Sequence, residues 1–352
     1  MATRIRVRRV LISGLLLCAA ATGMGCGARS APPAVFRLRA LAPNRSMIVG
    51  INTGAWGISA ARDVRTAFRF IRWDASLSES LRDYTSRGLK ADVVMSNPYT
   101  TRGVTALADE SWGARAVGWY QTNCHGSTSA CPVIEVLNEP YASAFWGNNA
   151  NSQANAVAYG KLVESTYDSF HARYGPKSPK ILASTVGAGC PNGSGPSCTT
   201  KWWSWLIAGV PDIRKYYDGV VIHPYGGGCD TSAWLSASGN RNAVTSAYVV
   251  TGKPVWVTEI GWPTATRVES CNVDSRQWAE RQQARNIYNF VTWARSTGYV
   301  AAVLYFGYRD YGPDSWYGLE RWGERDATLN GSKKLGWYAL ADAAEGRPCT
   351  VC

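Results

Sequence analysis

Histidine is scarce in this chain, with only 3 among 352 residues. They are His125, His171 and His223, and no set of cysteines and histidines repeats the ligand spacing of a zinc finger. A lyase or an isomerase would usually use a metal cluster or a catalytic lysine, and the sequence shows neither at the end of an apolar run. We therefore expect no metal and no cofactor.

The sequence also lacks an apolar run long enough to span a membrane comfortably, since its N-terminal apolar stretch covers only residues 10–21. Four arginines precede that stretch and small residues follow it, which is the pattern of a signal peptide. We expect this signal peptide to cover 1–25. Plain cleavage near residues 19–21 and lipoprotein processing before Cys26 are alternatives.

Residues 26–45 are rich in Ala, Pro and Arg and indicate a flexible tether, followed by one folded domain over 46–352. The leader predicts a secreted or cell-surface protein, in contact with the membrane only through a lipid anchor if Cys26 is processed. We find no internal repeat, coiled coil or second domain.

Runs of basic residues with interleaved aromatics are missing too, which argues against a nucleic-acid partner. The formal net charge is +12. Residues 1–25 hold four Arg and no acid, so the chain without them carries 12 − 4 = +8. This moderate charge suits solvated surface residues and retention at an anionic cell surface.

Phenylalanine is the rare aromatic, with 7 residues against 16 Trp and 18 Tyr. Trp and Tyr combine a flat apolar face with a polar edge. Sugars present C–H faces and hydroxyl edges, so this balance favours a carbohydrate partner over an ordinary apolar core alone.

Ten cysteines fit an exported protein with disulfides. Cys18 and Cys26 belong to the leader region, and 10 − 2 leaves an even number for pairing. Connectivity does not follow from sequence alone. Nearest-neighbour pairing predicts Cys124–Cys131, Cys190–Cys198, Cys229–Cys271 and Cys349–Cys352.

Short apolar runs alternate with helical patterns along the domain. Expected strands cover 47–52, 68–73, 91–95, 133–138, 180–184, 219–223, 255–259 and 301–306. Expected helices cover 77–88, 112–122, 155–174, 202–217, 240–250, 275–297 and 334–344. This alternation predicts an α/β fold, a single (β/α)8 TIM barrel with extended, disulfide-stapled βα loops.

Two of these strands end at a glutamate and then break at proline or glycine: Glu139 precedes Pro140, and Glu259 precedes Gly261-Trp262-Pro263. The carboxyl ends of parallel barrel strands meet at one mouth, so we expect the two side chains to lie together there. Such a pair is the minimum equipment for cleaving a glycosidic bond, because one carboxyl protonates the leaving oxygen and the other attacks or stabilises the sugar carbon.

Strand alternation makes finer predictions for the seventh strand. Val255, Val257 and Glu259 should share the face that points into the barrel. Trp256 and Thr258 should lie on the other face.

On the fourth strand, Asn138 and Glu139 can both face the mouth only if the strand bulges there. Glu135 has the same parity as Glu139 and would lie deeper in the barrel, where a buried carboxylate needs a partner such as Arg72. An outward-facing Glu135 is the alternative.

Three segments together resemble a known family. They are Asn138-Glu139-Pro140, His223-Pro224-Tyr225 and Thr258-Glu259-Ile260-Gly261-Trp262 on the fourth, sixth and seventh strands. They are similar to the large clan of retaining glycoside hydrolases with (β/α)8 barrels, which includes cellulases, mannanases and β-xylosidases. The likeness covers nearly the whole chain after the tether.

The resemblance implies that Glu139 is the acid/base and Glu259 the nucleophile of a double displacement through a covalent glycosyl-enzyme. It also implies a sugar contact for Asn138, a strand-two arginine at Arg72 or Arg69, and supporting roles for His223 and Tyr225. We expect the charge of Glu259 to raise the pKa of Glu139.

Other residues at strand ends are weaker candidates for binding substrate: Asn52, Asn97, Trp146 and Trp262. Many members of the clan place a tryptophan at the end of strand eight, but this chain has none there. The resemblance therefore assigns that platform to Phe306, Tyr308 or Trp316.

Two further functions stay open from sequence: a non-catalytic barrel that binds carbohydrate at the cell surface, and a transglycosylase, in which a sugar hydroxyl replaces water. The sequence leaves the sugar, the linkage and endo or exo action undetermined. We expect a monomer that binds carbohydrate and no nucleic acid.

Overall fold

The structure is a computed structural model that describes residues 41–53, 57–75, 80–96, 104–107, 111–146, 150–186, 196–225, 239–264, 276–310, 316–321 and 331–352. The predicted signal peptide and most of the predicted tether lie outside these residues and stay predictions. Within the described ranges, no helix has both the length and the apolar character needed to cross a membrane.

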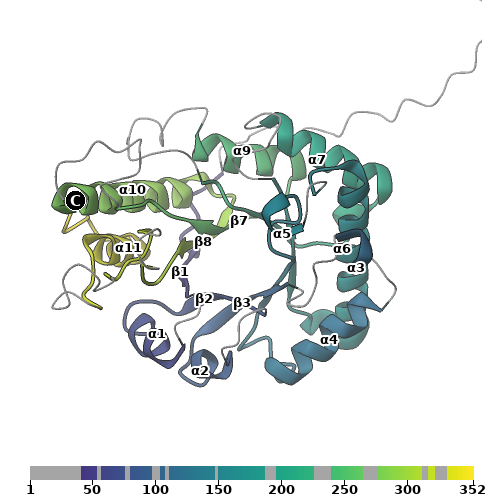
Figure 1. Ribbon diagram of the computed structural model, residues 1–352, viewed down its shortest axis with the longest axis horizontal. Coiled ribbons are helices and arrows are strands. Elements are labelled where there is room, and N and C mark those ends of the chain that lie inside the picture. Colours follow the sequence, from purple (N-terminus) through teal and green to yellow (C-terminus); the bar gives the residue numbers. More distant parts are fainter. Residues whose placement is uncertain are drawn as a thin grey trace, which may run out of the picture. The chain divides into compact units, whose positions relative to one another are not determined.

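Eight parallel strands close into a barrel, each paired with its neighbours in chain order (Figure 1). They are β1 (Ile48–Asn52), β2 (Phe70–Asp74), β3 (Lys90–Met95), β4 (Val133–Val136), β5 (Lys180–Ser184), β6 (Gly219–Ile222), β7 (Val255–Ile260) and β8 (Val300–Phe306). The predicted TIM barrel is confirmed, with strand ends shifted by at most two residues.

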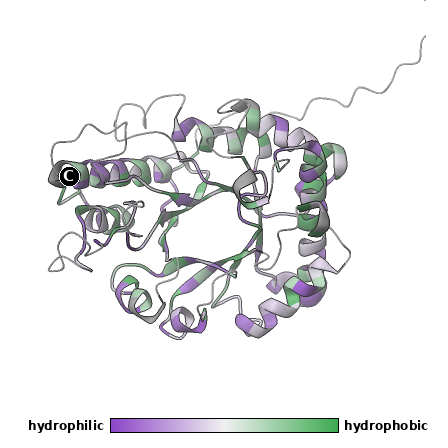
Figure 2. Cartoon of the chain, viewed as in Figure 1, coloured by the Kyte–Doolittle hydropathy of each residue, from purple (hydrophilic) through white to green (hydrophobic). Residues whose placement is uncertain are grey.

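Helices connect the strands and lie around the barrel, and Figure 2 shows hydrophilic and hydrophobic residues mixed along them, as expected for helices with one face on the strands. They are α1 (Gly57–Val64), α2 (Arg82–Thr85), α3 (Val104–Leu107), α4 (Trp112–Asn123), α5 (Ser143–Trp146), α6 (Gln153–Tyr174), α7 (Pro196–Gly209), α9 (Asn240–Thr251), α10 (Arg276–Thr297) and α11 (Leu335–Glu345), with short 3₁₀ turns η1 (Gly175–Lys177) and η2 (Ile213–Lys215).

The helix predicted over 202–217 is wrong at both ends. It begins at Pro196, a residue that suits a first helical turn, and it ends at Gly209. Pro211 explains the early end, because proline disfavours helical backbone at the residue before it. Only Arg82–Thr85 is helical among the described residues of the predicted helix 77–88.

The barrel interior holds a small apolar cluster of its own, separate from the larger core between strands and helices. Its buried members are Phe70, Val133, Leu182, Val221, Trp256, Ala302 and Leu304. Within this cluster Trp256 packs against Phe70, with ring centroids 6.3 Å apart.

The predicted orientation of the seventh strand is therefore wrong. Val255 and Val257 belong to the outer core, and Trp256 points into the barrel. Parallel strands are apolar on both faces, so their hydrophobic pattern does not distinguish inside from outside.

Two predicted disulfides are present. Cys124–Cys131 ties the end of α4 to the start of β4, and Cys349–Cys352 lies at the C-terminus. Cys198 is also disulfide-bonded, while the predicted partners Cys190, Cys229 and Cys271 lie outside the described residues.

Candidate active site

Glu139 reaches the barrel mouth because the chain leaves the extended conformation after β4. Leu137 and Glu139 have φ values of 60° and 41°, in the left-handed region that costs a non-glycine residue about 1–3 kcal/mol. Two hydrogen bonds hold the turn: the Trp146 indole N–H donates to the Asn138 carbonyl at 2.8 Å, and the Ser184 hydroxyl donates to the Leu137 carbonyl at 3.2 Å.

These two left-handed residues do on the fourth strand what we expected a bulge to do. They let Asn138 and Glu139 both face the barrel mouth after the strand has ended at Val136. The predicted bulge is therefore wrong, but the predicted orientation of the two side chains is right.

Glu259 reaches the mouth through a β-bulge on β7. Because Trp256 points inward, strict alternation would send Glu259 outward together with Val257. The register against β8 shifts between Val257 and Ile260, and a residue added to one strand reverses the alternation beyond it. The irregularity thus lies on the strand where the sequence did not predict it.

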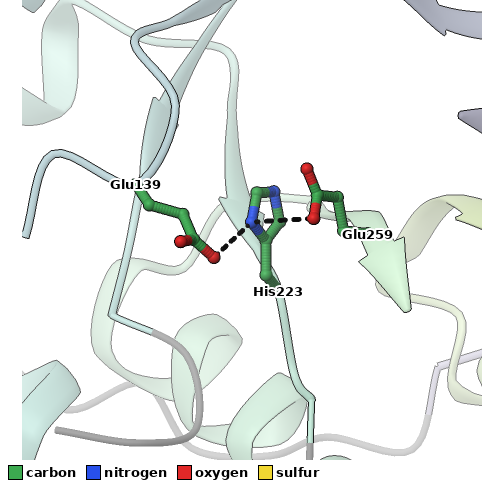
Figure 3. Close-up of side chains that lie close together, drawn as sticks. All are labelled: Glu139, His223 and Glu259. Carbon is green, nitrogen blue, oxygen red and sulfur yellow. Dashed lines mark hydrogen bonds and ion pairs between the residues drawn. The ribbon is translucent and has the colours of Figure 1, made fainter. Parts of the chain in front are cut away.

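The two carboxylates lie on either side of the His223 imidazole (Figure 3). His223 Nδ1 is 2.8 Å from Oε1 of Glu139 and 3.8 Å from Oε2 of Glu259. One carboxylate oxygen of each glutamate lies within 4.8 Å of the other. The Glu139 and Glu259 side chains are 20% and 13% exposed, against 2% for His223, so solvent and ligands reach the carboxylates from the mouth.

Arg72 lies beneath this pair and is almost fully buried. Its guanidinium donates from Nε and Nη2 to the two carboxylate oxygens of Glu135, at 2.9 and 2.8 Å. Nη1 donates to Glu259 Oε1 at 2.5 Å, and Nη2 also donates to Asn138 Oδ1 at 2.9 Å. Glu135 therefore lies inside the barrel, and Arg72 is its partner, as the first of the two alternatives predicted.

Burial alone would lower the pKa of Arg72, but the charges of Glu135 and Glu259 outweigh it and raise this pKa well above its ordinary value. The guanidinium therefore stays charged beside Glu259. The Tyr225 hydroxyl donates to Glu259 Oε2 at 3.0 Å, and the Asn52 amide lies 3.5 Å from Oε1. Three donors thus orient one carboxylate.

The expectation that Glu259 raises the pKa of Glu139 is wrong. Burial does raise it, but the hydrogen bond from His223 and the charges of His223 and Arg72 outweigh burial, and the pKa of Glu139 is lowered. Burial lowers the pKa of His223, but the charge of Glu259 and the hydrogen bond to Glu139 outweigh burial, so this pKa is raised. The shared proton therefore favours the His223 side of the 2.8 Å hydrogen bond.

The other predicted substrate-binding residues have different surroundings. Phe306 ends β8 beside Tyr225, with ring centroids 6.2 Å apart, and is partly exposed. Trp146 is 9% exposed, and its indole N–H holds the turn at Glu139 through the hydrogen bond to the Asn138 carbonyl. Asn97 lies outside the described residues.

Two aromatic residues lie in the packing and not among the groups gathered at the mouth. Trp262 is 3% exposed and packs on Phe290 of α10. Tyr308 is 2% exposed, donates its hydroxyl to Glu320 and packs on Trp337 of α11. The prediction that these two rings stack on a sugar has no support from this packing.

Three nearby residues were not among the sequence-based candidates. Thr258 Oγ1 lies 3.0 Å from His223 Nε2, and Tyr317 packs edge-on to Tyr225 with ring centroids 6.1 Å apart. Asp92 is fully buried on β3 in register with Arg72. The parity of Thr258 with an inward Trp256 would have revealed the first, but no local signal marks the other two.

A parallel (β/α)8 barrel with two mouth carboxylates, held by a buried arginine, a histidine and a tyrosine, defines a glycosidase-like class of site. The model of the family described as "Glycosyl hydrolase catalytic core" matches residues 105–320, which is more than half of the chain. The chain therefore belongs to this family. A comparison with curated protein sequences found no match.

Solved structures share the fold at low sequence identity. An endo-1,4-beta-xylanase of Penicillium canescens is 17% identical with a TM-score of 0.56, covering 88% of this chain and 97% of its own. An endo-beta-1,3-glucanase of Amycolatopsis mediterranei in complex with laminarihexaose is 15% identical with a TM-score of 0.53, covering 86% and 100%. Xylanase 10B of Thermotoga maritima is 12% identical with a TM-score of 0.51, covering 86% and 95%.

Proposed function

We propose that this protein is a retaining glycoside hydrolase in which Glu139 is the acid/base and Glu259 the nucleophile. The observation that carries the proposal is the short gap between the two carboxylates, whose nearest oxygens lie within 4.8 Å. Retaining enzymes place their carboxyl groups about 5–5.5 Å apart, whereas inverting enzymes leave about 6.5–9.5 Å for a water molecule.

In the first step, Glu139 protonates the leaving glycosidic oxygen while Glu259 attacks the anomeric carbon. The imidazole of His223, 2.8 Å from Glu139 Oε1, is the neighbouring source of that proton. Arg72 and Tyr225 orient the attacking carboxylate. In the second step, Glu139 accepts a proton from water while the water oxygen attacks the anomeric carbon and the bond from that carbon to Glu259 breaks. The sugar leaves with its original anomeric configuration.

The proposal gives Asn138 a contact with the sugar beside the scissile bond. It is supported by the hydrogen bond from Arg72 to the amide oxygen, which leaves the donors of the amide N–H₂ for a sugar hydroxyl. Phe306, Tyr225 and Tyr317 form an aromatic group next to Glu259. Flat rings beside the nucleophile suit the C–H face of a sugar.

We propose a β-linked polysaccharide such as xylan or β-1,3-glucan as substrate. The support is the shared fold with proteins named as a xylanase and a β-1,3-glucanase. The N-terminal leader, with its charge and its apolar stretch, further supports export of the enzyme to such extracellular polymers.

The proposal is tested by incubating the protein with a panel of these and other polysaccharides and of arylglycosides, and identifying the products. E259Q and E139Q each keep the shape of the side chain and should lower turnover of the polysaccharide by orders of magnitude. E345Q, at a half-exposed position on α11, is the matched control and should keep full activity. Equal activity of E259Q and the native protein would overturn the assignment of the nucleophile.

Two alternatives would show themselves in the same assay. A non-catalytic binding protein would retain polysaccharide without product from any member of the panel. A transglycosylase would give longer oligosaccharides as acceptor concentration rises, through the same glycosyl-enzyme.

A further inference from the structure

We propose that Glu139, His223 and Glu259 form a binding site for a divalent transition-metal ion such as Zn²⁺, which blocks the barrel mouth when bound. Each of the three residues offers one ligand atom, and these atoms all lie within 4.8 Å of one another. Figure 3 shows the imidazole between the two carboxylates, with Nδ1 on the side that faces the gap. The blocking effect rests on the proposed function, whereas the binding does not.

The distances suit a shared ion after small side-chain rotations. Ligand atoms about 2.0–2.2 Å from one Zn²⁺ ion lie about 3–4 Å from each other. Nδ1 of His223 lies 2.8 Å from Oε1 of Glu139 and 3.8 Å from Oε2 of Glu259. One imidazole and two carboxylates are a mixed nitrogen and oxygen set, which suits Zn²⁺ better than Mg²⁺, whose preferred ligands are carboxylates, carbonyls and water.

The surroundings hold the ligand atoms in place. Thr258 Oγ1 lies 3.0 Å from His223 Nε2, so the hydroxyl can accept the Nε2 proton and leave the Nδ1 lone pair directed at the ion. Arg72 and Asn52 contact Glu259 Oε1, whereas Oε2 accepts from the Tyr225 hydroxyl and keeps a further lone pair on the side of His223, 3.8 Å away. A metal-binding histidine fixed through its second nitrogen is the usual arrangement in metalloproteins.

The charges at the mouth also favour a divalent cation. A bound metal ion requires His223 to release the proton that it shares with Glu139. In that state Glu135, Glu139 and Glu259 contribute three negative charges and Arg72 one positive charge, which gives −3 + 1 = −2. An ion of charge +2 neutralises this group, and the 20% and 13% exposed carboxylates give it a path from solvent. Bound there, it would occupy the lone pairs that the glycosidase reaction needs.

The test is the stoichiometry of Zn²⁺ binding to the whole protein, measured by isothermal titration calorimetry. We expect the native protein to bind one equivalent more than E139Q, E259Q and H223Q, and Mg²⁺ to give no such equivalent. H171Q and H125N remove the other two histidines of the chain and should keep the native stoichiometry. The same number of equivalents in the native protein and in both Gln variants of the glutamates would overturn the proposal.

T258V tests whether the residues around the three ligands support metal binding. It removes only the acceptor for Nε2, and loss of such a support weakens metal binding by about 10–100-fold. An unchanged affinity would contradict the arrangement described here. Since calorimetry needs no turnover, loss of the glycosidase assignment would leave this result intact. If the protein does hydrolyse a polysaccharide, Zn²⁺ should inhibit it and a chelator should restore the rate.

Discussion

Arg72 on β2 forms a two-point ion pair with Glu135 on β4, inside the barrel and directly below the mouth. Nε donates to Oε2 at 2.9 Å and Nη2 donates to Oε1 at 2.8 Å. The same guanidinium uses its remaining nitrogen on Glu259. This buried pair thus fixes the orientation of one mouth carboxylate.

Replacing Arg72 by Lys should lower turnover by about 10²-fold or more, because an ammonium group cannot reach Glu135 and Glu259 in this fork geometry. Leaving part of buried Glu135 unpaired should also cost about 1–3 kcal/mol of unfolding free energy. Steady-state kinetics and urea unfolding measure the two effects. R62K, at an exposed position on α1, is the control, and equal behaviour of both variants would contradict the role of Arg72.

Asp92 should tolerate replacement by Asn. It is fully buried, and in the described part of the chain neither of its carboxyl oxygens has a hydrogen-bond partner. Burial and the charge of Glu135 raise its pKa well above 3.8, although the charge of Arg72 acts in the opposite direction. A carboxyl whose pKa is raised by folding binds its proton more tightly in the native state.

The stability contributed by that proton is complete below pH 3.8 and decreases as pH rises towards the folded pKa. D92N removes this decrease, so its thermal midpoint should match or exceed the native midpoint at neutral pH. D92A, which leaves a cavity, should be less stable than both. A D92N variant that melts several degrees lower would show that Asp92 is ionised and paired.

Glu320 should make the native protein less stable as pH rises from 4.5 to about 7. Burial and a hydrogen bond with Asp63 raise its pKa from 4.5 to about 7, even though Arg309 and Tyr308 donate to its carboxylate. Lys333 faces the pair from the Asp63 side at 2.9 Å. Because the folded pKa exceeds the unfolded one, the stability held at low pH is lost across this window.

E320Q should flatten this pH dependence, by on the order of 1–2 kcal/mol. Thermal midpoints measured across the window test it. D212N is the control, since Asp212 forms an exposed pair with Lys215 and its loss should change little. If the thermal midpoints of E320Q and the native protein changed in the same way with pH, a proton shared between Glu320 and Asp63 would be excluded.

The disulfide Cys124–Cys131 should matter more than Cys349–Cys352. The first closes a segment between α4 and β4, with a sequence separation of 7, and both its cysteines are buried. Its loss through C124A and C131A together should cost about 2–3 kcal/mol by the loop-closure estimate. The second has a separation of 3 at the chain end.

Removing the terminal pair through C349A and C352A should therefore lower the thermal midpoint less. Denaturant unfolding of the two double variants side by side makes the comparison. A larger loss for the terminal pair would mean that the C-terminal segment stabilises the barrel more than its position suggests.

The strands and both mouth glutamates could be predicted because the information is local: an apolar run, a carboxylate at its end and a following proline or glycine. The orientation of Trp256 could not, because β7 is apolar on both faces. The bulge before Ile260 and the left-handed backbone at Leu137 leave no mark in the residue pattern. Both arise from tertiary packing.

Which of Glu139 and His223 holds their shared proton could not be predicted from the sequence, for a related reason. A pKa depends on which groups approach from other strands, and His223 comes from β6 while Glu139 follows β4. Motif spacing predicted that these residues meet but gave no distances. The net effect of burial against hydrogen bonding therefore had to come from the structure.

The assignment of Glu259 as the nucleophile of a retaining enzyme is best tested by the anomeric configuration of the first product, followed by proton NMR during early hydrolysis of a β-linked oligosaccharide. With the two carboxylates this close, Glu259 should attack the anomeric carbon from one face, and water activated by Glu139 should then displace Glu259 from the other face. We therefore predict a β-configured sugar that mutarotates only later. An α-configured first product would contradict it.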